Sequence, residues 1–160
     1  MLKQISNLDQ VAYIREYTIT SGREAGVEVI ELYNGVLRVL LNKTKALDIM
    51  QVFHKGMNVS FVSKNGFSTR SDDFAKRFEG GMMYTVGLDS AGARDGFVMH
   101  GSFHNLKPII TRCEIVNHEI IVLGANTFKY KRHYRHITTV VRRPFDYLGQ
   151  QRRHIRKQEQ

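Results

Sequence analysis

Short strand-like runs separated by tight-turn signals constrain the fold of this chain more than any other feature. The runs at 27–33 and 36–41 flank Asn34-Gly35, a pair whose residues both tolerate the positive φ angles of a two-residue hairpin. Further strands are expected at 49–53, 57–61, 81–87, 97–103, 109–116 and 119–123, and short helical turns only at 8–14 and 74–78. Many short strands joined by turns favour an antiparallel sandwich or barrel over parallel βαβ units. The predicted fold class is therefore all-β.

The length and composition are those of one soluble domain. A chain of 160 residues is long enough to bury about 70% of its unfolded surface. The single cysteine, Cys113, excludes an internal disulfide, and a small buried hydrophobe is its expected role. The first residues carry charges and no long apolar run, so neither a signal peptide nor a membrane span is expected. These features predict a cytoplasmic protein without a membrane partner.

The positive charge is concentrated at the end of the chain. Residues 1–128 hold 14 Lys and Arg against 13 Asp and Glu, whereas residues 129–160 hold 10 against 2. We therefore predict a β-rich domain at 1–128 and a basic tail at 129–160. One interpretation is an arm that binds nucleic-acid phosphates, with Tyr130 and Tyr134 stacking on bases. The favoured interpretation is a truncated or frame-shifted product with a disordered tail, because the two parts differ abruptly; nucleic acid is then not an expected partner.

The segment at 79–104 has the composition of a site. It combines Gly80-Gly81, which permits close backbone approach or a tight bend, with two histidines that can titrate near neutral pH. If 97–103 continues as a strand, His100 and His104 lie on one face and share a pocket with Asn105. No third ligand has suitable spacing for a metal, so no metal and no cofactor are expected.

The order of several short motifs resembles an uncharacterised bacterial family related to aldose 1-epimerases, within the galactose mutarotase-like superfamily. The matching motifs are the Asn-Gly hairpin, Lys45-Ala46-Leu47-Asp48-Ile49, His54-Lys55-Gly56, Ser60-Phe61, Phe78-Glu79-Gly80-Gly81, Thr85-Val86-Gly87-Leu88, and His100-Gly101 with Asn105 and Pro108. The resemblance covers about residues 20–128. It implies a large antiparallel β-sandwich, or supersandwich, that binds a sugar across its concave face. This chain is expected to form an incomplete version of it.

The resemblance also implies roles for individual residues. His100 resembles the first active-site histidine of the mutarotases and is the predicted catalytic residue. The residues predicted to contact substrate are Lys45, Asp48, Lys76, Arg77, His104 and Asn105. Lys45 stands where the family usually has arginine, and lysine lacks the planar fork for two-point sugar recognition. From the residues alone, Lys45 could equally belong to a solvated loop, and Asp48 could cap a turn.

The chemistry that the resemblance implies is 1-epimerisation of an aldose, which needs a base and an acid on opposite sides of the sugar. In mutarotases the base is a glutamate far toward the C-terminus and a second histidine comes from mid-chain. This chain ends before either position, and Glu159 lies in a polar end segment. The function predicted is carbohydrate binding without turnover, and an active sugar epimerase is the alternative. Self-association is expected through strands left without partners.

Overall fold

Antiparallel strands account for most of the described structure. The computed structural model describes residues 5–70, 73–86, 99–117, 119–130 and 133–144, with side chains up to residue 125. In chain order the elements are η1 (Leu8–Gln10), β1 (Tyr13–Thr18), β2 (Glu28–Tyr33), β3 (Leu37–Asn42), β4 (Asp48–His54), β5 (Met57–Asn58), β6 (Phe61–Val62), α1 (Phe74–Arg77), β7 (Gly80–Gly81), η2 (Phe103–Asn105), β8 (Ile109–Val116), β9 (Glu119–Tyr130) and β10 (His133–Pro144). Among the described residues, helix is limited to one α-helical turn and two 3-10 turns.

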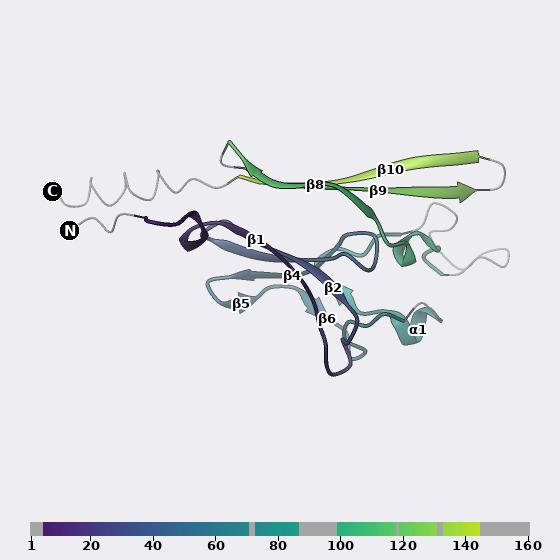
Figure 1. Ribbon diagram of the computed structural model, residues 1–160. Helices are drawn as coiled ribbons and strands as arrows, with labels where there is room; N and C mark the ends of the chain where they lie inside the picture. The colour runs from purple at the N-terminus through teal and green to yellow at the C-terminus, as the bar shows by residue number, and fades with distance from the viewer. Residues whose placement is uncertain (1–4, 71–72, 87–98, 118, 131–132, 145–160) are drawn as a thin grey trace.

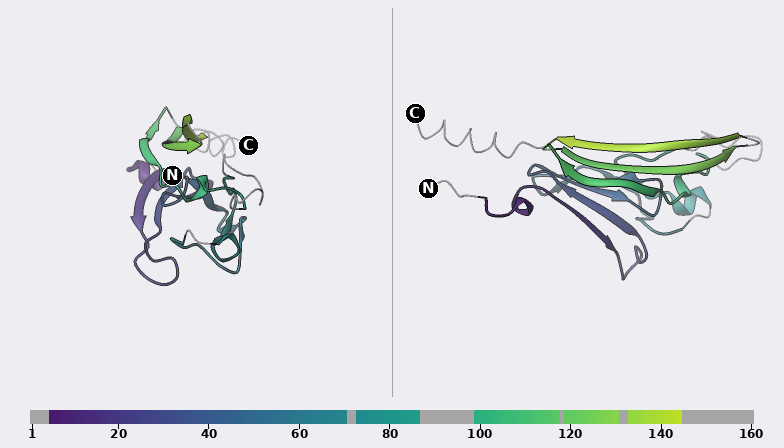
Figure 2. Two further views of the ribbon diagram at one scale, coloured as in Figure 1. Left: turned by 90° about the vertical axis from the view of Figure 1, so that its right-hand side faces the viewer. Right: turned by 45° about the horizontal axis from the view of Figure 1, so that its top comes forward.

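Two larger sheets stack face to face. One has five strands in the order β1-β2-β3-β4-β5, and the other has three in the order β10-β9-β8. A third, two-stranded sheet pairs β6 with β7. Figure 1 shows the β8–β10 sheet above the strands β1 to β4, and both views of Figure 2 keep the two layers side by side. This arrangement is a β-sandwich.

The main core lies between the two larger sheets. Its buried residues are Ala12, Ile30, Leu32, Val39, Leu41, Leu47, Ile49, Val52, Ile120 and Val122. A smaller core on the opposite face of the five-stranded sheet contains Val27, Val29, Met50 and Phe67. Because successive side chains of a strand point to opposite faces, β2 supplies Ile30 to one core and Val29 to the other.

A β-bulge at the start of β4 changes this alternation. Leu40 pairs with Gln51 and Leu41 pairs with Ile49, so Met50 is the extra residue on β4. Ile49 consequently faces the main core while Met50 faces the smaller one. The bulge follows Asp48 directly and bends the strand at the point where it enters the polar region described below.

The hairpins formed as the turn signals predicted. β2 and β3 pair across Asn34-Gly35, and Asn34 Oδ1 accepts hydrogen bonds from the backbone N–H groups of Val36 and Leu37. Lys55 and Gly56 adopt positive φ between β4 and β5, and Asn117 does so after β8. In each case the local sequence specified the turn.

The strands predicted at 81–87 and 97–103 are not present in the described residues. β7 ends at Gly81, because Gly80 and Gly81 both have positive φ, which an extended strand does not sustain. Phe103 begins the 3-10 helix η2 instead of ending a strand. Residues 87–98 lie outside the described part of the chain.

Backbone pairing continues past the predicted domain boundary at 128. The strand β10 pairs with β9 along its full length, from His133 opposite Tyr130 to Pro144 opposite Glu119. The division between 1–128 and 129–160 stays a prediction, and residues 145–160 lie outside the described part. No helix among the described residues is long and apolar enough to cross a membrane.

Candidate functional site

Asn42, the last residue of β3, organises the turn that leads into the site. Its side-chain Oδ1 accepts hydrogen bonds from the backbone N–H groups of Thr44 and Lys45, and its carbonyl accepts one from Leu47. The side chain thus replaces a backbone partner, as asparagine often does in turns. The turn ends at Asp48, the first residue of β4, so that Lys45 and Asp48 are both buried at one end of the sheet.

The same turn contains two residues in an unfavourable backbone conformation. Ala46 has φ 49° and Leu47 has φ 59°, the left-handed region that residues with a Cβ rarely occupy. A hydrogen bond of 2.8 Å from Ala46 N to Leu106 O holds the turn against the segment after η2. Strain of this kind persists only where the surroundings enforce it, and it is common at functional sites.

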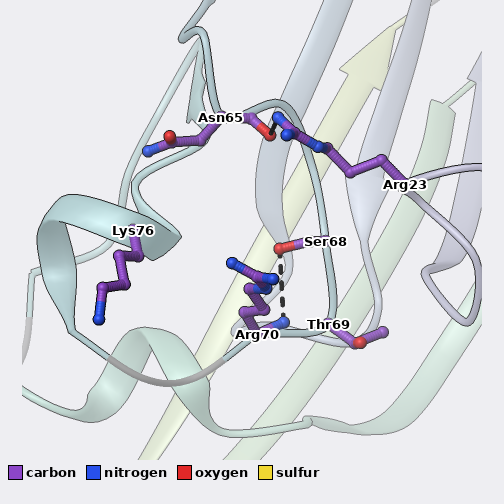
Figure 3. A pocket seen from close by; sticks show the side chains of 6 residues that line it. All are labelled: Arg23, Asn65, Ser68, Thr69, Arg70 and Lys76. Atoms are coloured by element: carbon purple, nitrogen blue, oxygen red, sulfur yellow. Dashed lines mark hydrogen bonds between the residues drawn. The ribbon is translucent and has the colours of Figure 1, made fainter.

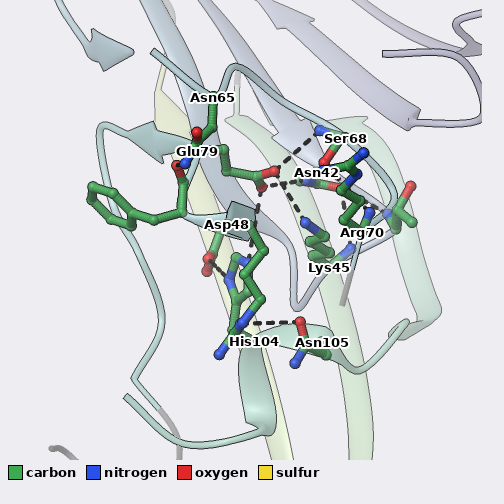
Figure 4. Close-up of polar contacts among 12 residues, drawn as sticks. Asn42, Lys45, Asp48, Asn65, Ser68, Arg70, Glu79, His104 and Asn105 are labelled. Atoms are coloured by element: carbon green, nitrogen blue, oxygen red, sulfur yellow. Dashed lines mark hydrogen bonds and ion pairs between the residues drawn. The ribbon is translucent and has the colours of Figure 1, made fainter. Parts of the chain in front are cut away.

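Glu79, between α1 and β7, forms a buried ion pair with Lys45. The Lys45 Nζ to Glu79 Oε2 distance is 3.1 Å, and both side chains are 2% exposed. Glu79 also accepts hydrogen bonds from Asn42 Nδ2 at 3.0 Å and from the Ser68 backbone N–H at 3.3 Å (Figure 4). Three donors therefore satisfy this carboxylate, as burial of a charge requires.

Asp48 holds His104, which lies on η2. The distance from His104 Nδ1 to Asp48 Oδ2 is 2.7 Å, and Asp48 also accepts hydrogen bonds from the backbone N–H and the hydroxyl of Thr85. Because an ionised carboxylate only accepts, Nδ1 of His104 is the donor in this contact. The buried Nε2 has no hydrogen-bond partner among the described residues and lies 4.0 Å from Glu79 Oε1.

Tyr84 contacts both histidines and the guanidinium of Arg77. Its ring stacks on His104 at 4.0 Å between centroids and meets the His100 ring edge-on at 6.4 Å. Its hydroxyl accepts a hydrogen bond from Arg77, which also donates to Asn105 Oδ1, both at 3.1 Å. Burial raises the pKa of Tyr84 to about 12, with Arg77 opposing the shift and Asp48 adding to it. The phenol is therefore neutral at physiological pH.

His100 reaches this group from a turn. It has φ 63° and packs edge-on against the ring of Phe74, with 4.5 Å between centroids. The prediction that a continuous strand would place His100 and His104 on one face is wrong, because His104 belongs to a 3-10 turn. The two imidazoles nevertheless lie on the same aromatic group, through their common neighbour Tyr84.

The predicted site residues fall into two sets. Lys45, Asp48, Arg77, His104 and Asn105 join the network just described, and His100 lies beside it. Lys76 is exposed and lines a separate pocket together with Arg70. Whether these side chains act in catalysis or substrate contact stays a prediction.

Glu79 and Tyr84 are the important residues that sequence reasoning missed. Both lie within the motif-rich segment at 79–104. Neither carries a local sign of burial, because Glu79 pairs with a lysine 34 residues earlier and Tyr84 stacks on a histidine 20 residues later.

The Asp48 carboxylate orients the His104 imidazole, and a histidine held in this way can take part in acid–base chemistry. Among the described residues, no group of three or more potential metal ligands gathers.

Comparison with known proteins assigns a family and supports the fold. Residues 24–138 match the sequence profile of a family described as a domain of unknown function (DUF4432). The chain belongs to this family. No curated protein matches it.

A crystal structure from Klebsiella pneumoniae, described as that of a putative aldose 1-epimerase, is similar in fold, with a TM-score of 0.53 and 15% sequence identity. The match covers 82% of this chain and 39% of the other, so the chain spans well under half the length of that protein. The all-β sandwich is similar in fold to that structure, which confirms the predicted fold class.

Proposed function

We propose that this DUF4432 chain is a carbohydrate-binding protein related to aldose 1-epimerases, and that it holds a sugar at His100 and Tyr84 without turnover. The observation that carries the proposal is the placement of both imidazoles on the Tyr84 ring, with Arg77 joining Tyr84 to Asn105. Aromatic faces can pack against the C–H surfaces of a sugar, while imidazole and amide groups donate to and accept from its hydroxyls.

The proposed contacts divide by burial. His100 and Asn105 are only partly buried and supply the edge that meets the sugar. Lys45 and Arg77 are buried and already bonded to protein groups, so they fix the wall behind that edge. His104 belongs to this wall too, and its buried Nε2, which has no hydrogen-bond partner among the described residues, is the proposed contact of a sugar hydroxyl.

Binding without turnover is favoured because the two buried carboxylates are already engaged. Asp48 accepts from His104 and Thr85, and Glu79 accepts from Lys45 and two further donors. A carboxylate with its lone pairs occupied in this way is poorly placed to remove the anomeric proton of a ligand.

Ligand-observed NMR with glucose and galactose tests the proposal. We expect saturation transfer to at least one of these sugars, and we expect the substitution His100→Ala to abolish it. His54→Ala, at the last residue of β4, is the matched control and should leave the transfer unchanged. Equal transfer to both variants would show that His100 is not a sugar contact.

An active epimerase is the second candidate, because Asp48 orients His104 as acid–base catalysis requires. Polarimetry on freshly dissolved α-glucose and α-galactose distinguishes the two candidates. We expect the mutarotation rate to equal that of buffer at neutral pH. An accelerated rate that His100→Ala abolishes would establish the enzyme and refute binding without turnover.

A further inference from the structure

A basic pocket opens next to the buried network, and Ser68, which lines it, donates its backbone N–H to Glu79. Its volume is about 330 Å³, near the small end of the range of about 300–1,000 Å³ for ligand pockets. The residues that line it are Arg23, Asn65, Ser68, Thr69, Arg70 and Lys76 (Figure 3). They come from the loop after β1, the loop after β6 and the helix α1. Every lining side chain except Asn65, whose amide hydrogens bond backbone carbonyls, can donate a hydrogen bond to a ligand, and three of them are cationic.

The positive charge of this pocket is not offset by its own lining. None of the lining residues carries a negative charge. Within the described part of the chain, the Lys76 ammonium and the Arg70 guanidinium make no hydrogen bond or ion pair. The nearest buried carboxylate is that of Glu79, behind Ser68, and Lys45 already pairs with it. A ligand in the pocket therefore meets three cationic side chains and no carboxylate among the lining residues.

One of the three cations, Arg23, is held in place by hydrogen bonds to the loop after β6. Arg23 donates to the backbone carbonyls of Lys64 at 3.1 Å and Asn65 at 2.5 Å. The Asn65 side chain donates to the carbonyls of Ala75 and Phe78, at 2.9 and 3.0 Å, and so ties the loop to α1. These bonds fix Arg23 relative to the helix that carries Lys76. A pre-organised group of donors binds an anion at a lower entropic cost than mobile side chains do.

We propose that this pocket binds the phosphate group of an anionic sugar. The inference rests on the proposed function and names its ligand class. Helix α1 connects the two regions, since its Phe74 packs on His100 while its Lys76 lines the pocket. Two arginines and a lysine supply the charge-assisted and forked hydrogen bonds that suit a compact dianion with several oxygens.

Binding measurements with three probes test this proposal, by calorimetry on the full chain. The probes are glucose, glucose 6-phosphate and inorganic phosphate. We expect glucose 6-phosphate to bind about tenfold or more tightly than either glucose or inorganic phosphate, because both regions then contribute. Equal affinity for glucose and glucose 6-phosphate would overturn the proposal. Equal affinity for inorganic phosphate and glucose 6-phosphate would also overturn it, by showing a site for the free ion.

Three variants locate the contacts. Arg70→Gln and Lys76→Gln should each weaken glucose 6-phosphate binding by about tenfold, since each removes a charge-assisted bond to the phosphate. Lys55→Gln removes the same charge from the β4–β5 turn and should leave the affinity within about twofold. An equal loss in all three variants would mean non-specific attraction and would overturn the proposal.

The variant His100→Ala separates this proposal from the proposed function. If Arg70→Gln and Lys76→Gln weaken binding but His100→Ala does not, the phosphate pocket stands and the sugar site at Tyr84 fails. If only His100→Ala weakens binding, the sugar site stands and the phosphate pocket fails.

Discussion

Lys43 and Lys45 lie two residues apart in the turn after β3, yet their environments differ completely. Lys43 pairs with Glu16 on the surface, where both side chains are partly exposed. Lys45 pairs with Glu79 in the interior. An exposed ion pair is screened by water, whereas the loss of one partner from a buried pair leaves a charge without compensation. At the scale of single residues, burial therefore makes Lys45 the lysine that is more important for stability.

This contrast makes a direct prediction. Lys45→Met should lower the free energy of unfolding by about 3–5 kcal/mol, because it leaves Glu79 charged and buried. Lys43→Met should lower it by about 0–1 kcal/mol. Urea unfolding followed by circular dichroism measures both values. Similar losses for the two variants would contradict the structural role assigned to Lys45.

At the scale of elements, β7 shows why paired glycines were needed and why no long strand follows them. A Cβ on Gly81 would lie 2.9 Å from the Ile49 carbonyl oxygen, and the backbone there has φ 112°. The approach is so close because Met82 N donates to the same carbonyl at 2.9 Å. β7 is thereby held against the bulged start of β4, which places Glu79 and Tyr84 on either side of it.

The substitution Gly81→Ala tests this close packing. We expect it to lower the free energy of unfolding by about 1–3 kcal/mol more than Gly56→Ala does. Gly56 also has positive φ, but nothing lies within 4 Å of its added Cβ, so it reports the backbone cost alone. Thermal or urea unfolding of the two variants gives the difference. If the two variants lose the same free energy of unfolding, the close approach of Gly81 to Ile49 adds no cost to the substitution.

The sequence predicted some elements well and others poorly, for a physical reason. The hairpins at Asn34-Gly35 and Lys55-Gly56 depend on backbone preferences of adjacent residues, which a sequence displays directly. The run at 81–87 looks like a strand by composition, but the positive φ of Gly81 follows from its contact with β4. A contact with a distant strand leaves no local pattern to read.

At the scale of the whole molecule, apolar side chains gather at one edge of the sandwich. The exposed members around β5, β6 and β7 are Met57, Val59, Phe61, Val62, Met82 and Met83. Strand edges and apolar patches of this kind favour association with another surface. The predicted self-association is therefore expected to involve this edge.

Sedimentation velocity over a range of concentrations tests that expectation. Met57 is 69% exposed on β5, and Met57→Lys should shift the population toward monomer, because a charge on an edge strand opposes pairing. Leu8→Lys, at a residue 42% exposed near the N-terminus, should leave the distribution unchanged. A monomeric parent protein would refute the expectation outright.

The sequence by itself determined the all-β class, the principal hairpins and most of the polar residues that meet at the site, because alternation and turn chemistry are local properties. It did not determine how those residues are used. The Lys45–Glu79 and Asp48–His104 pairs join positions 34 and 56 residues apart, and only the folded chain shows that they are buried and mutually bonded. The tertiary structure alone also assembled Arg23, Arg70 and Lys76 into one pocket. Burial and the approach of distant segments depend on the whole fold, so a local sequence pattern does not display them.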